Sequence, residues 1–210
     1  AFGNLAVPLY NLVPALLGPV TLSLAPTLSA AFAAGDGRTV GEQMAGALRL
    51  MALIAAPATL GLAAFAYPIL SLLYRSEEQA TLVAAPLLSL LAVSLPLLVL
   101  GTLLATALQA SGRTSVPVLA MLSGAGVKVA AEYVLLARPD VGILAAPIST
   151  LLCHGTVLLI EALVLLFCVR VRVSLFPALL RAFGAAAIAV GAGLLLYRGL
   201  ALLGLGAPPL

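Results

Sequence analysis

The chain has 210 residues, of which 63% are hydrophobic and only 8% charged, with a formal net charge of +3. A soluble domain carries about 25% charged residues, so this composition and a mean hydropathy of +1.24 indicate a membrane protein. The scattered basic residues and the absence of tryptophan exclude a nucleic-acid-binding surface, which needs basic residues clustered on one face.

The first predicted element is a membrane-crossing helix at about residues 7–34, because the first 35 residues contain no Asp, Glu, Lys, Arg or His. Roughly 20 apolar residues cross a bilayer core. The block also carries prolines, at Pro8, Pro14, Pro19 and Pro26. Interior prolines remove backbone hydrogen bonds, and in lipid the freed carbonyls need partners in neighbouring helices, hydroxyls or water. We therefore expect this helix to pack against protein or to line a cavity, as in a transporter.

Five more apolar blocks follow, and they predict crossings at about 45–74, 80–110, 116–137, 143–169 and 175–197. The block at 80–110 exceeds one span, so we expect a short interfacial helix before its crossing. Six spans with short connections predict an all-α antiparallel bundle of a polytopic membrane protein. Residues 1–173 hold five of the spans, and residues 174–210 hold the sixth. Small residues, as at 123–126 and 184–187, allow helices to approach closely.

The arginines predict how the bundle is oriented. Six lie toward the loops on one side, namely Arg38, Arg49, Arg113, Arg170, Arg172 and Arg181, and three toward the other, namely Arg75, Arg138 and Arg198. The excess of basic residues marks the cytoplasmic side, so the N-terminus of this chain is expected on the extracytoplasmic side. Because Ala1 opens in apolar sequence without the basic region of a signal peptide, we expect a piece of a longer protein.

Charged residues inside the spans are the first candidates for substrate binding, since each costs ~2.5–3.5 kcal/mol to insert. Lys128 and Glu132 are four residues apart on the predicted span 116–137. One interpretation is a structural ion pair, although lysine before glutamate is the weaker order. The other is that Lys128 faces a cavity and attracts a pyrophosphate-linked lipid, for which an ammonium is a suitable point charge.

Other polar residues add four candidates. His154 and Glu161 are seven residues apart on one helical face, which Thr150 extends. This stripe lines a cavity, relays protons, or packs against a neighbouring helix. Asn11 and Gln109 contact substrate, or they hydrogen-bond carbonyls freed near prolines.

No enzyme, metal or cofactor is predicted. The sequence lacks a nucleophile–base constellation and a phosphate-binding glycine loop. Cys153 and Cys168 lie ~22 Å apart if one helix holds both, which excludes a disulfide and favours a packing role.

Several short segments in chain order carry a family resemblance: 9–16 (LYNLVPAL), 22–29 (LSLAPTLS), 67–74 (YPILSLLY), 108–113 (LQASGR), 127–133 (VKVAAEY) and 142–150 (GILAAPIST). Together they resemble the stage V sporulation protein B family of polysaccharide exporters. That family belongs to the multidrug/oligosaccharidyl-lipid/polysaccharide flippase superfamily, alongside the MurJ-type lipid II flippases.

The resemblance implies that the six blocks form most of the C-terminal lobe of a fold with about fourteen spans, in which two lobes rock around a central cavity. It implies an undecaprenyl-linked saccharide as substrate, the bacterial cytoplasmic membrane as location, and membrane lipids and the missing N-terminal lobe as partners. MurJ-type members place an arginine in the helix that matches 7–34, where this chain has Ala6, Val7 and Pro8. The charge that meets a phosphate is therefore expected from Lys128 or from the missing half.

Lipid-linked oligosaccharide flipping is the leading functional hypothesis. The alternatives are a cation-coupled exporter of drugs or small metabolites from the same superfamily, and a non-transporting membrane scaffold in envelope assembly.

Overall fold

A computed structural model of the chain describes residues 5–74, 78–138, 141–169 and 176–202. Every element in these ranges is helical: α1 (Val7–Ala33), α2 (Gly37–Ala64), α3 (Ala66–Leu73), α4 (Glu78–Ala92), α5 (Leu95–Ala110), α6 (Ser115–Leu136), the 3-10 turn η2 (Gly142–Leu144), α7 (Ala145–Val164), the π turn η3 (Leu165–Val169) and α8 (Phe176–Leu202).

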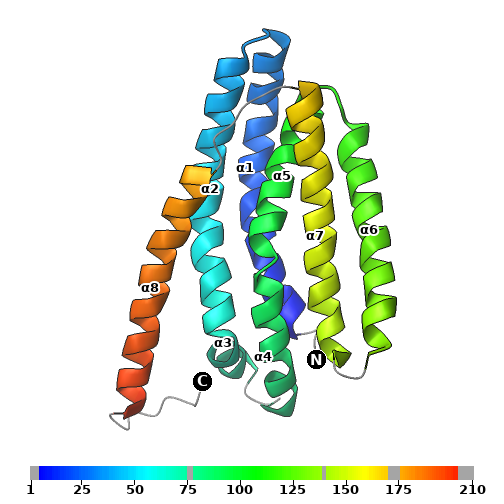
Figure 1. The fold of residues 1–210 in the computed structure, drawn as a ribbon. Coiled ribbons are helices and arrows are strands. Elements are labelled where there is room, and N and C mark those ends of the chain that lie inside the picture. Colours follow the sequence, from blue (N-terminus) through cyan, green and yellow to red (C-terminus); the bar gives the residue numbers. More distant parts are fainter. Residues whose placement is uncertain (1–4, 75–77, 139–140, 170–175, 203–210) are drawn as a thin grey trace.

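The long helices run up and down the molecule, and successive connections alternate between its two ends (Figure 1). In the described ranges, the segments α1, α2, α6, 142–167 and 179–197 are each long and apolar enough to cross a membrane. The pair α4 and α5 passes the same test together, with a bend of 43° between the two helices. The chain is therefore an all-α, multi-pass membrane protein, as the sequence predicts.

Two predicted spans are each divided into two helices, and a proline lies just beyond each division. α2 ends at Ala64 and α4 ends at Ala92, in each case four residues before a proline, Pro68 or Pro96. A proline has no N–H to donate to the carbonyl four residues earlier, and its ring collides with that carbonyl. The predicted block 45–74 is thus two helices, α2 and α3, and the block 80–110 is the bent pair α4 and α5 in place of the short interfacial helix expected before its crossing. α2 also begins at Gly37, earlier than predicted.

Glycine closes two helices at the end of the molecule where α1 meets α2. Gly35 follows α1 with a φ of 68°, and Gly112 follows α5 with a φ of 83°. The N–H of Asp36 bonds to the carbonyl of Ala31, and the N–H of Gly35 bonds to that of Phe32. This pattern satisfies carbonyls that the helix end leaves unpaired, and it requires the left-handed backbone that glycine adopts without strain. Residues 34–37 thus form a compact turn.

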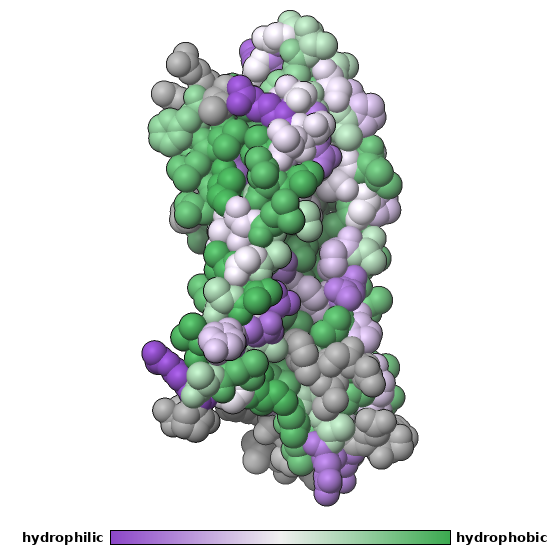
Figure 2. Space-filling view, turned by 90° about the vertical axis from the view of Figure 1, so that its right-hand side faces the viewer, coloured by the Kyte–Doolittle hydropathy of each residue, from purple (hydrophilic) through white to green (hydrophobic). Residues whose placement is uncertain are grey.

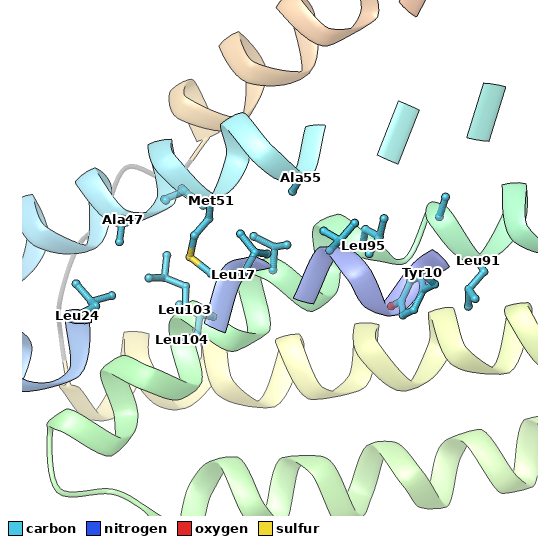
Figure 3. Packing of buried hydrophobic residues seen from close by; sticks show 14 of the residues in the cluster. Tyr10, Leu17, Leu24, Ala47, Met51, Ala55, Leu91, Leu95, Leu103 and Leu104 are labelled. Carbon is cyan, nitrogen blue, oxygen red and sulfur yellow. The ribbon is translucent and has the colours of Figure 1, made fainter. Parts of the chain in front are cut away.

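The main core lies where α1, α2, α4 and α5 meet. Met51 of α2, fully buried, points toward Leu17 of α1 and toward α5 around Leu103 (Figure 3). Along α1, the hydroxyls of Thr21 and Thr27 donate to carbonyls three residues earlier. These two hydroxyls are thus satisfied within α1 itself, as a polar group in lipid requires.

α6 and α8 flank this core on opposite sides (Figure 1). α6 packs on α7 through Gly124, where an added Cβ would stand 3.1 Å from the backbone carbonyl oxygen of Cys153. α8 packs on α2, and Tyr197 meets Phe65 edge to face with ring centroids 6.2 Å apart. The right-hand side of the molecule, which carries α6, is mostly hydrophobic in Figure 2, with hydrophilic residues at its ends and a few points between. Such a surface is suited to lipid or to further apolar protein.

Parts of the predicted charge pattern lie outside the described residues, namely Arg75, Arg170, Arg172 and the side chain of Arg198. The side chain of Cys168 lies outside them as well.

Candidate functional site

The candidate site is a cavity of about 390 Å³ between α5, α6 and α7, with Pro14 of α1 completing its wall. Four of the six residues that the sequence singles out line it: Gln109 on α5, Lys128 on α6, and His154 and Glu161 on α7. The remaining wall is mostly apolar, with Leu97, Leu98, Met121, Ala125 and Val157 among its residues. The three helices thus gather polar groups that lie up to 52 residues apart, from Gln109 to Glu161.

Glu161 is the most enclosed ionisable side chain of the cavity, since only 1% of its surface is exposed. Its Oε2 has no hydrogen-bond partner among the described residues. The carboxylate oxygen lies 3.6 Å from the point where a side chain on Gly101 of α5 would begin. The absence of a side chain at Gly101 therefore leaves the space that the carboxyl group occupies.

His154 and Lys128 are half-buried and line the same cavity. The Nδ1 atom of His154 is buried and has no partner within the described part of the chain. Counted along the helices at 1.5 Å per residue, His154 and Lys128 each lie about 12–14 Å from the end of the molecule where α6 joins α7. Glu161 lies about 10 Å further along α7. The cavity consequently has two cationic or basic groups at one level and an acid at another.

The ion pair that the sequence allows between Lys128 and Glu132 is absent from the structure. No salt bridge joins the two side chains in the described residues, although they occupy positions four apart on α6. Lys128 lines the cavity, whereas the half-buried Glu132 does not. Lysine before glutamate is the weaker order for such a pair.

Asn11 and Gln109 do not bond the carbonyls freed by prolines, because neither side chain makes a hydrogen bond to a described residue. Asn11 is exposed on α1 and lies outside the cavity wall, although Pro14 one turn later belongs to it. Thr150 also lies outside that wall, and its hydroxyl donates to the carbonyl of Ala146 over 2.9 Å. The stripe predicted on α7 thus narrows to His154 and Glu161.

Gly101, Thr102 and Cys153 are cavity residues that the sequence reasoning missed as site candidates. Cys153 is interpreted from sequence as a packing residue, and it does contact Gly124, but its half-buried side chain also belongs to the cavity wall. Only the pairing of α5 with α7 reveals Gly101, since a lone glycine in an apolar block carries no signal of its own. In the described residues, no three His, Cys, Asp or Glu side chains lie close enough to hold a metal ion.

An intramembrane cavity that gathers ionisable side chains from several spans is typical of a membrane transporter. The chain belongs to the lipid II flippase MurJ family, whose sequence model matches residues 4–205. The match supports the flippase superfamily that the sequence resemblance indicates, and with it a transporter that handles a lipid-linked precursor in a multi-pass membrane setting. No curated protein and no solved structure matches the chain.

Proposed function

We propose that this chain forms one lobe of a flippase that moves a lipid-linked saccharide of the lipid II type across the bacterial cytoplasmic membrane by alternating access. The observation that carries the proposal is the presence of Lys128 in an otherwise mostly apolar intramembrane cavity, in a chain of the MurJ family. An ammonium is a suitable partner for a phosphate. Apolar walls suit the isoprenoid carbons that adjoin it.

The size of the cavity defines the part of the substrate that it takes. Ligand sites commonly measure about 300–1,000 Å³, so a volume of 390 Å³ suits one phosphate with the atoms next to it. The rest of the lipid would lie between this lobe and a second lobe. Rocking of the two lobes about the shared site would then expose it to each side of the membrane in turn.

Lipid II flipping by the full-length protein in liposomes tests this proposal, with Lys128→Gln as the variant. Loss of a charged hydrogen bond of ~1.5–3 kcal/mol should weaken substrate affinity by about tenfold or more, and Lys128→Arg should retain most of it. Glu132→Gln is the matched control, because Glu132 lies on the same helix outside the cavity wall. The proposal fails if the intact protein flips no lipid II, or if Lys128→Gln binds and flips it as well as the intact protein.

A second candidate function, cation-coupled export of a drug or small metabolite, is favoured by one observation. Glu161 is an enclosed acid without a partner among the described residues, and buried acids in transporters serve coupling cations. Export that stops when the sodium or proton gradient collapses would support this function. Flipping of lipid II that continues without either gradient would oppose it.

The stage V sporulation protein B-like character of the chain remains part of the proposal and rests on the segments 9–16 and 22–29. It predicts that an undecaprenyl-linked saccharide other than lipid II competes with lipid II for transport. The prediction is contradicted if a saturating concentration of such a lipid leaves the rate of lipid II flipping unchanged.

A further inference from the structure

The environment of Glu161 raises the question of what neutralises it. Its side chain is 1% exposed, and no described residue donates a hydrogen bond to its Oε2 or forms a salt bridge with it. An isolated carboxylate in such surroundings costs several kcal/mol, whereas a carboxylic acid avoids most of that cost. A proton is the smallest cation that can remove the charge without further ligands.

Among the described residues, the titratable side chains that line the cavity come from two helices. α6 contributes Lys128, and α7 contributes Cys153 and His154. The lining residues of α1 and α5 include no titratable side chain. Tyr10 of α1 is not part of the wall, and its hydroxyl is bonded to Ser94. α4 packs on α7 but contributes no residue to the wall. None of these groups forms an ion pair with Glu161.

The contact with Gly101 connects the carboxyl group to the position of α5. Glu161 Oε2 lies 3.6 Å from the position of a Cβ on Gly101, so α5 rests on the carboxyl group with no side chain between them. α5 begins immediately after the break at Val93 and Ser94, where it bends 43° from α4. α5 is therefore not one continuous helix with α4.

We propose that Glu161 is a proton-binding site whose occupancy controls the packing of α5 on α7. With its O–H bond intact, the acid packs beside Gly101 and the cavity stays narrow. When that bond breaks, the proton passes to a water molecule in the cavity, and the carboxylate draws further water between α5 and α7. Rebinding of a proton reverses the change. The link from this opening to lipid movement rests on the proposed flippase function.

Cys153 provides a native reporter, because it lines the same cavity and is half-buried. The full-length protein carrying Cys168→Ala is labelled with N-ethylmaleimide over a range of pH, with and without Glu161→Gln. Ionisation of the thiol raises the labelling rates of both proteins, so their ratio removes it, apart from the effect that the charge of Glu161 itself has on the thiol. The labelling rate of the protein with Glu161, divided by that of the Glu161→Gln protein, should rise with pH. The rise should be up to about tenfold per pH unit for a change linked to one proton.

The direction of the ratio distinguishes opening from a simple charge effect. A negative Glu161 near the thiol would disfavour the thiolate and would lower the ratio as pH rises. A ratio that stays constant or falls therefore overturns the proposal. Should Glu161→Gln fail to fold, Glu161→Asp replaces it: the aspartate keeps a protonatable group, so a steep labelling profile should persist, and a profile that follows only the thiol refutes the site.

The labelling needs no transport, so the two proposals can fail separately. A rising ratio in a protein that flips no lipid II leaves the proton site intact and removes the flippase function. Lipid II flipping combined with a constant ratio of labelling rates supports the flippase function and removes the proton site.

Discussion

Tyr10 and Ser94 connect α1 to the break between α4 and α5, with 3.0 Å between their hydroxyl oxygens. Ser94 donates its own proton to the carbonyl of Leu91 over 2.8 Å, so the Tyr10 hydroxyl is the donor in the longer bond. Both side chains are buried. The bond therefore fixes the start of α5 against α1 at the position from which α5 reaches the cavity.

The first prediction concerns this connection. Tyr10→Phe should lower the free energy of unfolding by about 0.5–1.5 kcal/mol, since the ring remains packed and one hydrogen bond is lost. Ser94→Ala and the double variant complete a cycle, and a coupling energy of at least about 0.5 kcal/mol should remain between the two sites. Thermal unfolding in detergent provides the measurement. Additive effects would show that the contact does not join the helices energetically.

The second prediction compares two glycines of α6. A Cβ on Gly124 would lie 2.7 Å from Cγ2 of Val157, whereas a Cβ on Gly126 would meet nothing within 4 Å. Gly124→Ala should destabilise the α6–α7 pair by about 1–3 kcal/mol through overpacking. Gly126→Ala, the matched control, should be neutral or stabilising by up to about 1 kcal/mol, because alanine favours helix. Equal melting temperatures for the two variants would contradict the close packing.

The third prediction concerns pH and the turn between α1 and α2. The hydroxyl of Thr39, and next the backbone N–H of the same residue, bond to Asp36 and lower the pKa of its carboxyl group. A lowered folded-state pKa gives a stabilisation that is complete above the ordinary pKa and is lost as the pH falls through the lower value. Acidification should therefore lower the melting temperature of the intact protein more than that of Asp36→Asn.

The asparagine control keeps an acceptor for the helix N-terminus but does not titrate. Because Asp36 is exposed, the difference between the two proteins should be small and should shrink further at high salt. An intact protein whose melting temperature falls relative to that of Asp36→Asn as the pH rises would have the wrong sign for this cap.

The fourth prediction tests which end of the bundle is cytoplasmic. Ala34 and Ala137 are both exposed, and they lie at opposite ends of the molecule, beside the α1–α2 turn and after α6 (Figure 1). In a background with both native cysteines replaced, an impermeant maleimide added to intact cells should label Ala137→Cys and leave Ala34→Cys unlabelled. The reverse pattern would invert the orientation inferred from the arginines.

The sequence by itself determined that the chain is an all-α, multi-pass membrane protein, and it indicated where the apolar segments lie. Long apolar blocks separated by charges and turns form membrane-spanning helices, because a helix satisfies the hydrogen bonds of its own backbone in lipid. Gly35 and Gly112 also end their helices in the short connections that the sequence predicts between spans. The breaks before Pro68 and Pro96 required the structure, since Pro14, Pro19 and Pro26 occur within an unbroken helix.

The tertiary structure alone decided which polar side chains meet. Lys128 and Glu132 are neighbours on one helix, yet only Lys128 lines the cavity. The partner of Glu161 across the α5–α7 contact is Gly101, which lies 60 residues away in the sequence. Helical periodicity defines the face on which a residue lies, but the neighbouring helix that covers that face is set by side-chain packing between segments distant in the chain.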